Sequence, residues 1–119
     1  MIGTLPAWIV AELATQAEDA SPAEACGFVA VDQAGTAVRM YAVPNRAAGL
    51  GAYTIDPADL FAVISDTERR GWEIGAIYHS HPSGPSRPSR TDLDSAIDPE
   101  WLSLIVSPQG DAWIVKAFR

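Results

Sequence analysis

Cysteine and basic residues are scarce in this sequence, and each scarcity excludes a class of function. The 119 residues include one cysteine, Cys26, so the chain can form neither an internal disulfide nor a cysteine-rich zinc site. There are 8 Lys and Arg against 15 Asp and Glu, a formal net charge of -7, and the basic residues form no cluster. Because phosphate binding needs clustered positive charge, we expect no nucleic-acid partner.

Long hydrophobic runs are also missing. The segment 1–20 has no basic start and is interrupted by Glu12, Glu18 and Asp19, which argues against a signal peptide and a membrane span. We therefore expect a soluble, cytoplasmic protein with no membrane partner. A hydrophobic content of 48% is enough for one core, so we expect a single domain over residues 1–119.

Two helices are predicted from capping residues and apolar spacing. Thr4 can cap the first, in which an early Pro6 is tolerated and which runs to about Ala20. Asp56 can cap the second, with Pro57 at its first position. Trp8, Ile9 and Leu13 mark the apolar face of the first helix; Leu60, Phe61, Val63, Ile64 and Thr67 mark that of the second, and Gly71 ends it.

The strands are predicted from short runs of β-forming residues. Ranges 27–31 and 38–43 flank turn-forming residues and are expected to pair as an antiparallel hairpin. Range 72–78 is apolar without clear alternation, as expected for a strand covered on both faces. The other predicted elements are a strand at 52–55, a short helix at 89–97 and a closing hairpin of strands at 102–106 and 112–118. This order predicts an α/β (α+β) sandwich with one mixed, largely antiparallel sheet flanked by helices; a small doubly wound fold is the alternative.

The only two histidines of the chain are one residue apart, in His79-Ser80-His81-Pro82. Residues i and i+2 of a strand share a face, so both imidazoles can bind one metal ion while Ser80 faces away. With Asp92 they supply three ligands, which is typical of a catalytic zinc with an open fourth position. The alternative is a pair of histidines that only form hydrogen bonds at the end of a strand.

Several other roles stay open on residue patterns alone. Ser89-x-x-Asp92 also fits a capping box, and Asp94 is an alternative third ligand. Glu24 ends a second such pattern, Ser21 to Glu24, but a strand follows it and leaves no helix to cap. Glu24 is therefore either a catalytic acid or base, or an acid that faces solvent.

Two further sets of residues have a functional and a structural interpretation. Cys26 could be a nucleophile paired with a histidine, although a small buried residue is simpler. Arg87 and Arg90 flank the proposed metal and could bind a substrate carboxylate or carbonyl, or be solvated loop residues. The loop 82–88, rigid with proline, is where we would look for a substrate. The tryptophans are interpreted as packing residues of the core or its rim; they are Trp8, Trp72, Trp101 and Trp113.

Together these residues resemble the motif of the JAMM (MPN+, JAB1/MPN/Mov34) metalloprotease family. That motif is an upstream glutamate, then His-x-His-Pro, six residues, a serine, two residues and an aspartate. It is matched here by Glu24, His79-Ser80-His81-Pro82, residues 83–88, Ser89 and Asp92. Residues 22–27, Pro-Ala-Glu-Ala-Cys-Gly, also resemble the first strand region of the family.

The resemblance implies a JAMM/MPN (cytidine-deaminase-like) fold, one zinc ion per chain and a metallo-isopeptidase or peptidase activity. It implies that Asp92, and not Asp94, is the third ligand. It further implies that Glu24 is the general base that activates the water held by zinc, and that Ser89 stabilises the oxyanion. The implied zinc ligands are His79, His81 and Asp92.

The chain is most similar to minimal prokaryotic members that hydrolyse an amide bond after the C-terminal Gly-Gly of a ubiquitin-like or sulfur-carrier protein. Residues 88–92, Pro-Ser-Arg-Thr-Asp, fit that subgroup. One alternative is a non-catalytic MPN-type module that binds a ubiquitin-like partner, although no ligand is lost here. Another is a RadC-like protein, which His-Pro-Ser-Gly at 81–84 also resembles. Small members of the family often pair, so a homodimer is possible.

Overall fold

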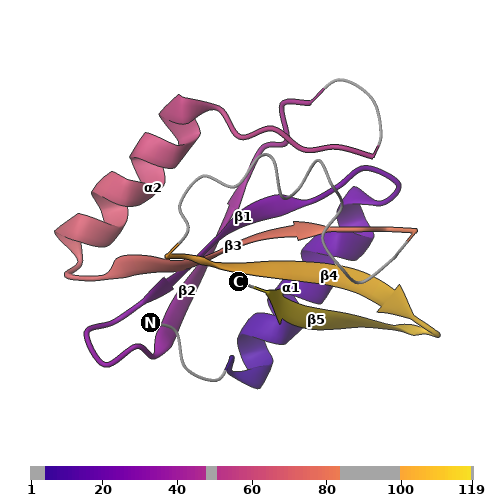
Figure 1. The fold of residues 1–119 in the computed structure, drawn as a ribbon, viewed down its shortest axis with the longest axis horizontal. Helices are drawn as coiled ribbons and strands as arrows, with labels where there is room; N and C mark the ends of the chain where they lie inside the picture. The colour runs from indigo at the N-terminus through magenta and orange to yellow at the C-terminus, as the bar shows by residue number, and fades with distance from the viewer. Residues whose placement is uncertain (1–4, 48–50, 84–99, 119) are drawn as a thin grey trace.

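The fold is one five-stranded sheet with a helix on each face, as Figure 1 shows. The computed structural model describes residues 5–47, 51–83 and 100–118. The elements within these ranges are α1 (Ala7–Ala20), β1 (Cys26–Val31), β2 (Ala37–Val43), α2 (Pro57–Arg69), β3 (Glu73–Ser80), β4 (Leu102–Gln109) and β5 (Ala112–Phe118). Within these ranges, neither helix combines the length and the apolar character that crossing a membrane requires.

The strand order is β2-β1-β3-β4-β5, and only β3 and β4 run parallel among these neighbours. The predicted hairpins, β1–β2 and β4–β5, are both present. The predicted mixed, largely antiparallel α+β sheet is therefore confirmed. The central strand β3 is buried from Ile74 to Ser80, as expected for a strand between two covered faces.

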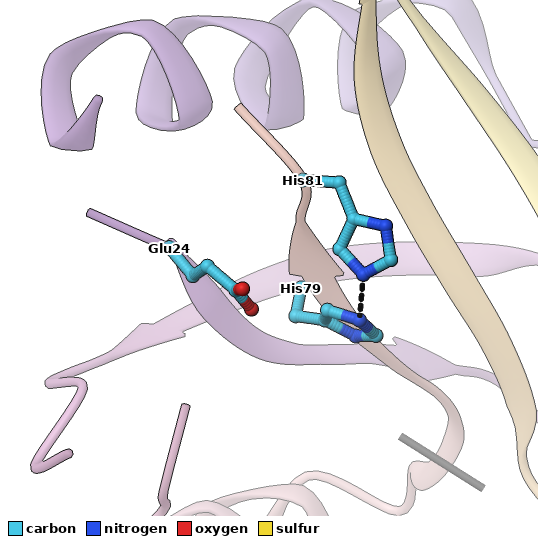
Figure 2. A group of neighbouring side chains, drawn as sticks. All are labelled: Glu24, His79 and His81. Carbon is cyan, nitrogen blue, oxygen red and sulfur yellow. Dashed lines mark hydrogen bonds between the residues drawn. The ribbon is translucent and has the colours of Figure 1, made fainter. Parts of the chain in front are cut away.

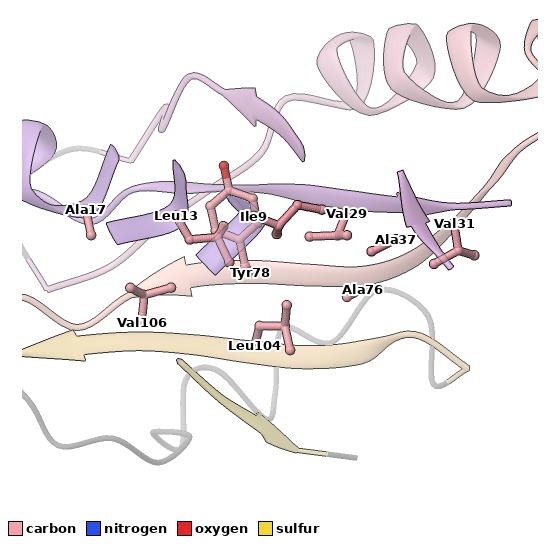
Figure 3. Close-up of a cluster of buried hydrophobic side chains, with 10 residues drawn as sticks. All are labelled: Ile9, Leu13, Ala17, Val29, Val31, Ala37, Ala76, Tyr78, Leu104 and Val106. Atoms are coloured by element: carbon pink, nitrogen blue, oxygen red, sulfur yellow. The ribbon is translucent and has the colours of Figure 1, made fainter. Parts of the chain in front are cut away.

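The larger hydrophobic cluster lies between the sheet and α1 (Figure 3). Ile9, Leu13 and Ala17 are four residues apart, so they form one stripe along α1, and all three are buried. The strand residues that complete the cluster are Val29, Val31, Ala37, Ala76, Tyr78, Leu104 and Val106. Burying this stripe fixes the helix against the sheet.

The smaller cluster lies between the sheet and α2 and is built around Phe28, Val63, Ile74 and Ile77. Ile74 and Ile77 are three positions apart yet belong to the same cluster. A register shift explains this, because Val29 pairs with Ala76 while the next residue along β1 pairs with Ile74. The bulge puts both isoleucines on the face that also carries His79.

The ends of α2 follow the predicted capping chemistry. The Asp56 side chain accepts a hydrogen bond from the Ala58 amide at 2.8 Å, and Pro57 occupies the first turn. After α2, Gly71 has a φ of 77°, the left-handed conformation that favours glycine at a helix end.

Four local predictions are wrong. The first helix begins at Ala7 with an extended Pro6 at the N-cap position, so Thr4, which lies outside the described residues, does not occupy that position. Residues 52–55 form no strand. Phe61 is 70% exposed and Trp8 is 50% exposed, because both lie off the buried stripes of their helices. The predicted helix at 89–97 lies outside the described residues.

Candidate metal and catalytic site

Pairing between β1 and β3 brings Glu24 to the two histidines across 55 positions of sequence. Cys26 is opposite His79 in this antiparallel pair, and the Ser80 amide donates to the Ala25 carbonyl at 2.9 Å. Continuing that register places Glu24 opposite His81. Glu24 precedes β1 and no helix follows it, so the capping-box interpretation of Ser21 to Glu24 does not apply.

The side chains of Glu24, His79 and His81 converge (Figure 2). One potential ligand atom from each residue lies within 4.8 Å of those from the other two. All three side chains are buried, with exposed fractions of 7%, 1% and 7% respectively. Among the described residues, this is a group whose chemistry and spacing suit a metal ion.

The separation of the two imidazoles fits a shared zinc ion. The Nε2 atoms of His79 and His81 are 2.9 Å apart. Two nitrogens that each lie about 2.0–2.1 Å from one zinc ion can be at most about 4 Å apart, so this distance fits. Imidazole nitrogen and carboxylate oxygen are also donors that zinc accepts.

The histidines lie on the α2 side of the sheet. Tyr78 belongs to the cluster under α1, so alternation along β3 puts His79 on the opposite face. There the ring of Tyr53, which packs against the smaller cluster, stacks on the His79 imidazole with ring centroids 4.5 Å apart and an interplanar angle of 17°.

Ser80 faces away from the histidines, as predicted, but the sequence did not indicate what it does. Its Oγ accepts a hydrogen bond from the Ala25 amide at 2.8 Å. This bond fixes the backbone next to Glu24, so Ser80 supports the site from behind. Asn45 and Tyr53 also contact the site residues and were missed, because their partners in the site are more than 20 positions away and no local pattern connects them.

Cys26 does not have the properties of a nucleophile. Its side chain is fully buried, and its Sγ donates to the Val43 carbonyl at 3.7 Å. Burial, aided by the negative charge of Glu24, raises the pKa of the Cys26 thiol to about 11. The thiol is therefore protonated near neutral pH, which supports the interpretation of Cys26 as a small buried residue.

The remaining predicted site residues lie outside the described residues. They are Arg87, Ser89, Arg90, Asp92 and the alternative ligand Asp94.

Curated relatives of this chain have names that describe an activity. A desampylase of Haloferax volcanii is 38% identical over 104 residues, which cover 82% of this chain and 75% of the relative. A probable TtuB-protein conjugate cleaving protease of Thermus thermophilus is 42% identical over 59 residues, which cover 49% of this chain and 40% of the relative.

Solved structures show the same fold. A protein from Desulfitobacterium hafniense superposes with a TM-score of 0.87 at 31% identity, over 99% of this chain and 83% of that chain. A JAB1/MPN domain protein from Archaeoglobus fulgidus superposes with a TM-score of 0.60 at 17% identity, over 92% and 82% respectively. The expected JAMM/MPN fold is therefore confirmed.

The family assignment rests on a match that spans nearly the whole chain. Residues 6–118 match the family described as prokaryotic homologs of the JAB domain. With the peptidase-type names of its relatives, this confirms the prediction that the chain is an enzyme of the JAMM peptidase and isopeptidase type. The chain belongs to the prokaryotic JAB-domain family.

Proposed function

We propose that this protein is a zinc-dependent hydrolase that cleaves an amide bond after the C-terminal Gly-Gly of a small ubiquitin-like or sulfur-carrier protein. The observation that carries the proposal is the buried convergence of Glu24, His79 and His81 within 4.8 Å. Two imidazoles and a carboxylate at this spacing can hold a metal ion and move a proton beside it.

In this proposal His79, His81 and Asp92 hold one zinc ion. When bound, zinc supplies a Lewis acid that lowers the pKa of water and polarises a carbonyl, which addresses both barriers to amide hydrolysis. Burial of the two histidines keeps their imidazoles in one orientation and excludes competing bulk water.

Glu24 is the proposed general base. Its carboxylate lies close enough to both imidazoles to accept a proton from the attacking water and to return it to the leaving amine. Ser89 is proposed to donate a hydrogen bond to the developing oxyanion, and Arg87 and Arg90 are proposed to bind the substrate.

The substrate class is proposed from two sources. The sequence resembles the subgroup that acts on carriers ending in Gly-Gly, and one relative is named for cleaving protein conjugates. We extend that chemistry to this chain and propose a cytoplasmic setting. A homodimer remains a prediction.

Hydrolysis by metal-loaded protein is the direct test. A carrier protein extended beyond its Gly-Gly is incubated with the wild type, Glu24→Gln and His81→Ala, and the products are weighed by mass spectrometry. We expect cleavage after Gly-Gly by the wild type only. Zinc content should stay near one ion per chain in Glu24→Gln and fall in His81→Ala.

The zinc content also separates two roles of Glu24. Loss of zinc in Glu24→Gln would make Glu24 a ligand and not a base, and robust turnover by Glu24→Gln would refute the assigned base. If untagged wild-type protein binds no zinc near neutral pH, the non-catalytic MPN-type module is favoured.

A further inference from the structure

The Tyr53 ring covers one face of a proposed zinc ligand. It stacks on the His79 imidazole at 4.5 Å between centroids, nearly parallel at 17°. The second histidine ring meets His79 differently, at 4.7 Å and tilted by 59°. Stacking on one side therefore sets the plane of the His79 ring, and that plane decides where its Nε2 points.

Tyr53 lies in a segment without helix or strand, and the side chain of Asn45 holds that segment. The Asn45 Oδ1 accepts from the Thr54 amide at 3.1 Å, and its Nδ2 donates to the Ala52 carbonyl at 3.1 Å. These are the two neighbours of Tyr53. A backbone bond from the Arg46 amide to the Thr54 carbonyl, at 2.9 Å, adds to the same support.

The same Asn45 amide also binds the backbone of the proposed base. Its Nδ2 donates to the Glu24 carbonyl at 3.0 Å, and its Oδ1 accepts a further bond from the Ala47 amide at 2.9 Å. A primary amide has two N–H donors and two acceptor lone pairs, so Asn45 uses all four. One side chain therefore connects Glu24 to the loop that stacks on His79.

We infer that Asn45 and Tyr53 are positioning residues of the metal site. Tyr53 fixes the plane of the His79 ring, and Asn45 fixes both the Tyr53 loop and the backbone of Glu24. The distance between the Glu24 carboxylate and the His79 imidazole is thereby held constant. The inference rests on the proposed function, because it assigns His79 to zinc and Glu24 to proton transfer.

Zinc affinity tests the role of Tyr53. The dissociation constant for Zn²⁺ is measured by competition with a chromophoric chelator for the wild type, Tyr53→Leu and Tyr53→Phe. We expect Tyr53→Leu to raise the dissociation constant for Zn²⁺ about tenfold or more, because residues that orient a metal ligand typically contribute at least this much to metal affinity. Tyr53→Phe keeps the ring and should stay within about twofold of the wild type.

Trp101→Leu is the matched control. Trp101 is an aromatic residue that packs against the same smaller cluster, edge-on to Phe28 at 5.6 Å between centroids. Its loss should lower the free energy of unfolding without changing zinc affinity. Equal zinc affinity in Tyr53→Leu and Tyr53→Phe would overturn the role of Tyr53.

Asn45→Asp tests the connection and leaves Tyr53 itself unchanged. The substitution keeps both acceptors but removes the two N–H donors to the Glu24 and Ala52 carbonyls. With zinc saturating, we expect kcat to fall at least tenfold with little change in KM, because the displaced group is the base. A wild-type kcat would overturn the role of Asn45.

A metal-free measurement makes the test independent of turnover. In the wild-type protein without zinc, the ring current of Tyr53 should shift the His79 ring protons upfield in the NMR spectrum. The shift should be lost in Tyr53→Leu, kept in Tyr53→Phe and reduced in Asn45→Asp. A wild-type protein that shows the shift but neither binds zinc nor cleaves would contradict the proposed function and not the geometry. Wild-type activity without the shift would contradict the inference alone.

Discussion

Ala25 and Ser80 exchange two hydrogen bonds across 55 positions of sequence. The Ser80 amide donates to the Ala25 carbonyl at 2.9 Å, and the Ala25 amide donates to the Ser80 Oγ at 2.8 Å. Their neighbours are Glu24 on one side and the two histidines on the other. This pair therefore sets how far the proposed base lies from the proposed ligands.

Ser80→Ala should destabilise the protein by about 1–3 kcal/mol, because it leaves the buried Ala25 amide without its acceptor. The free energy of unfolding is measured in urea. Ser107→Ala is the matched control, because it removes a buried serine hydroxyl that makes no hydrogen bond with the described residues, and it should cost little. If Ser80→Ala costs no more than Ser107→Ala, the lost hydrogen bond is not the cause.

The pair of histidines was predictable because its signal is local. His79 and His81 are two residues apart, so alternation along a strand puts them on one face whatever the rest of the chain does. Helix ends such as Asp56 were predictable for the same reason, since a cap bonds within its own turn. Local chemistry therefore accounts for the start of a helix and for the two histidines of the site.

The supporting residues were not predictable because their contacts depend on tertiary placement. The range 52–55 has β-forming residues but forms no strand. Its backbone groups form hydrogen bonds with the Asn45 side chain and the Arg46 amide and not with a neighbouring strand. Tyr53 meets His79 only after that loop folds back over the sheet. Trp8 and Phe61 are apolar but exposed, because helical spacing places them beside the buried stripe.

Gly27→Ala should lower the free energy of unfolding by about 3 kcal/mol or more, because the packing around Gly27 leaves no room for a methyl group. A Cβ at Gly27 would overlap the carbonyl oxygen of Tyr41, which is backbone and cannot move away, and would lie 2.5 Å from the Tyr78 hydroxyl. Urea unfolding measures the loss.

Gly71→Ala is the matched control for Gly27→Ala. Gly71 has a φ of +77°, and no atom of the described residues would lie within 4 Å of a Cβ there, so the same substitution should cost only the left-handed strain of about 1–2 kcal/mol. A smaller loss at Gly27 than at Gly71 would contradict the packing argument.

Cys26→Ala should keep hydrolytic activity, because a fully buried thiol whose pKa is raised to about 11 is not a nucleophile. The native wild type should also resist iodoacetamide at pH 8, whereas urea-unfolded protein should gain one alkyl group by mass. Loss of activity in Cys26→Ala with unchanged zinc content and folding would revive the nucleophile interpretation.

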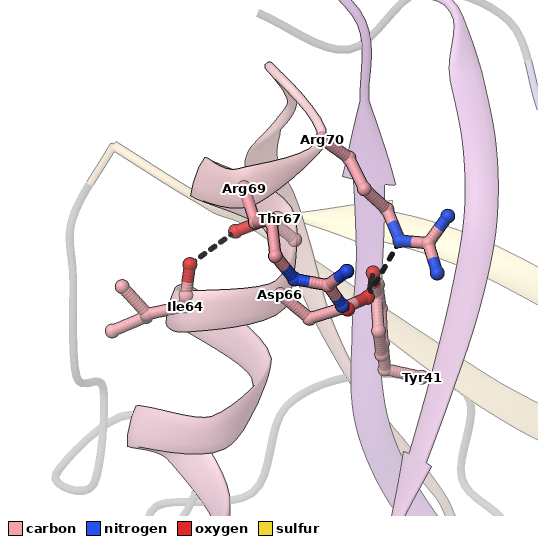
Figure 4. Close-up of polar contacts among 6 residues, drawn as sticks. All are labelled: Tyr41, Ile64, Asp66, Thr67, Arg69 and Arg70. Carbon is pink, nitrogen blue, oxygen red and sulfur yellow. Dashed lines mark hydrogen bonds and ion pairs between the residues drawn. The ribbon is translucent and has the colours of Figure 1, made fainter.

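Protonation of the Asp66 carboxylate should lower the free energy of unfolding at acid pH. Figure 4 shows its carboxylate with Tyr41, Arg69 and Arg70. The hydrogen bond from the Tyr41 hydroxyl, at 2.5 Å, and then the Arg70 guanidinium lower the pKa of Asp66 from 3.8 to about 2. The Asp66 carboxylate therefore binds a proton less readily in the folded protein than in the unfolded chain.

Because the pKa is lower in the folded state, this stabilisation is present above pH 3.8 and is lost as the pH falls toward 2. Asp66→Asn removes it, so the difference in unfolding free energy between wild type and Asp66→Asn should shrink through that range. Tyr41→Phe removes the leading cause of the lowered pKa, so its loss of stability on acidification should be smaller than that of the wild type and complete at a higher pH. A difference between wild type and Asp66→Asn that stays constant from pH 6 to pH 2 would show that the carboxylate charge contributes nothing to this cluster.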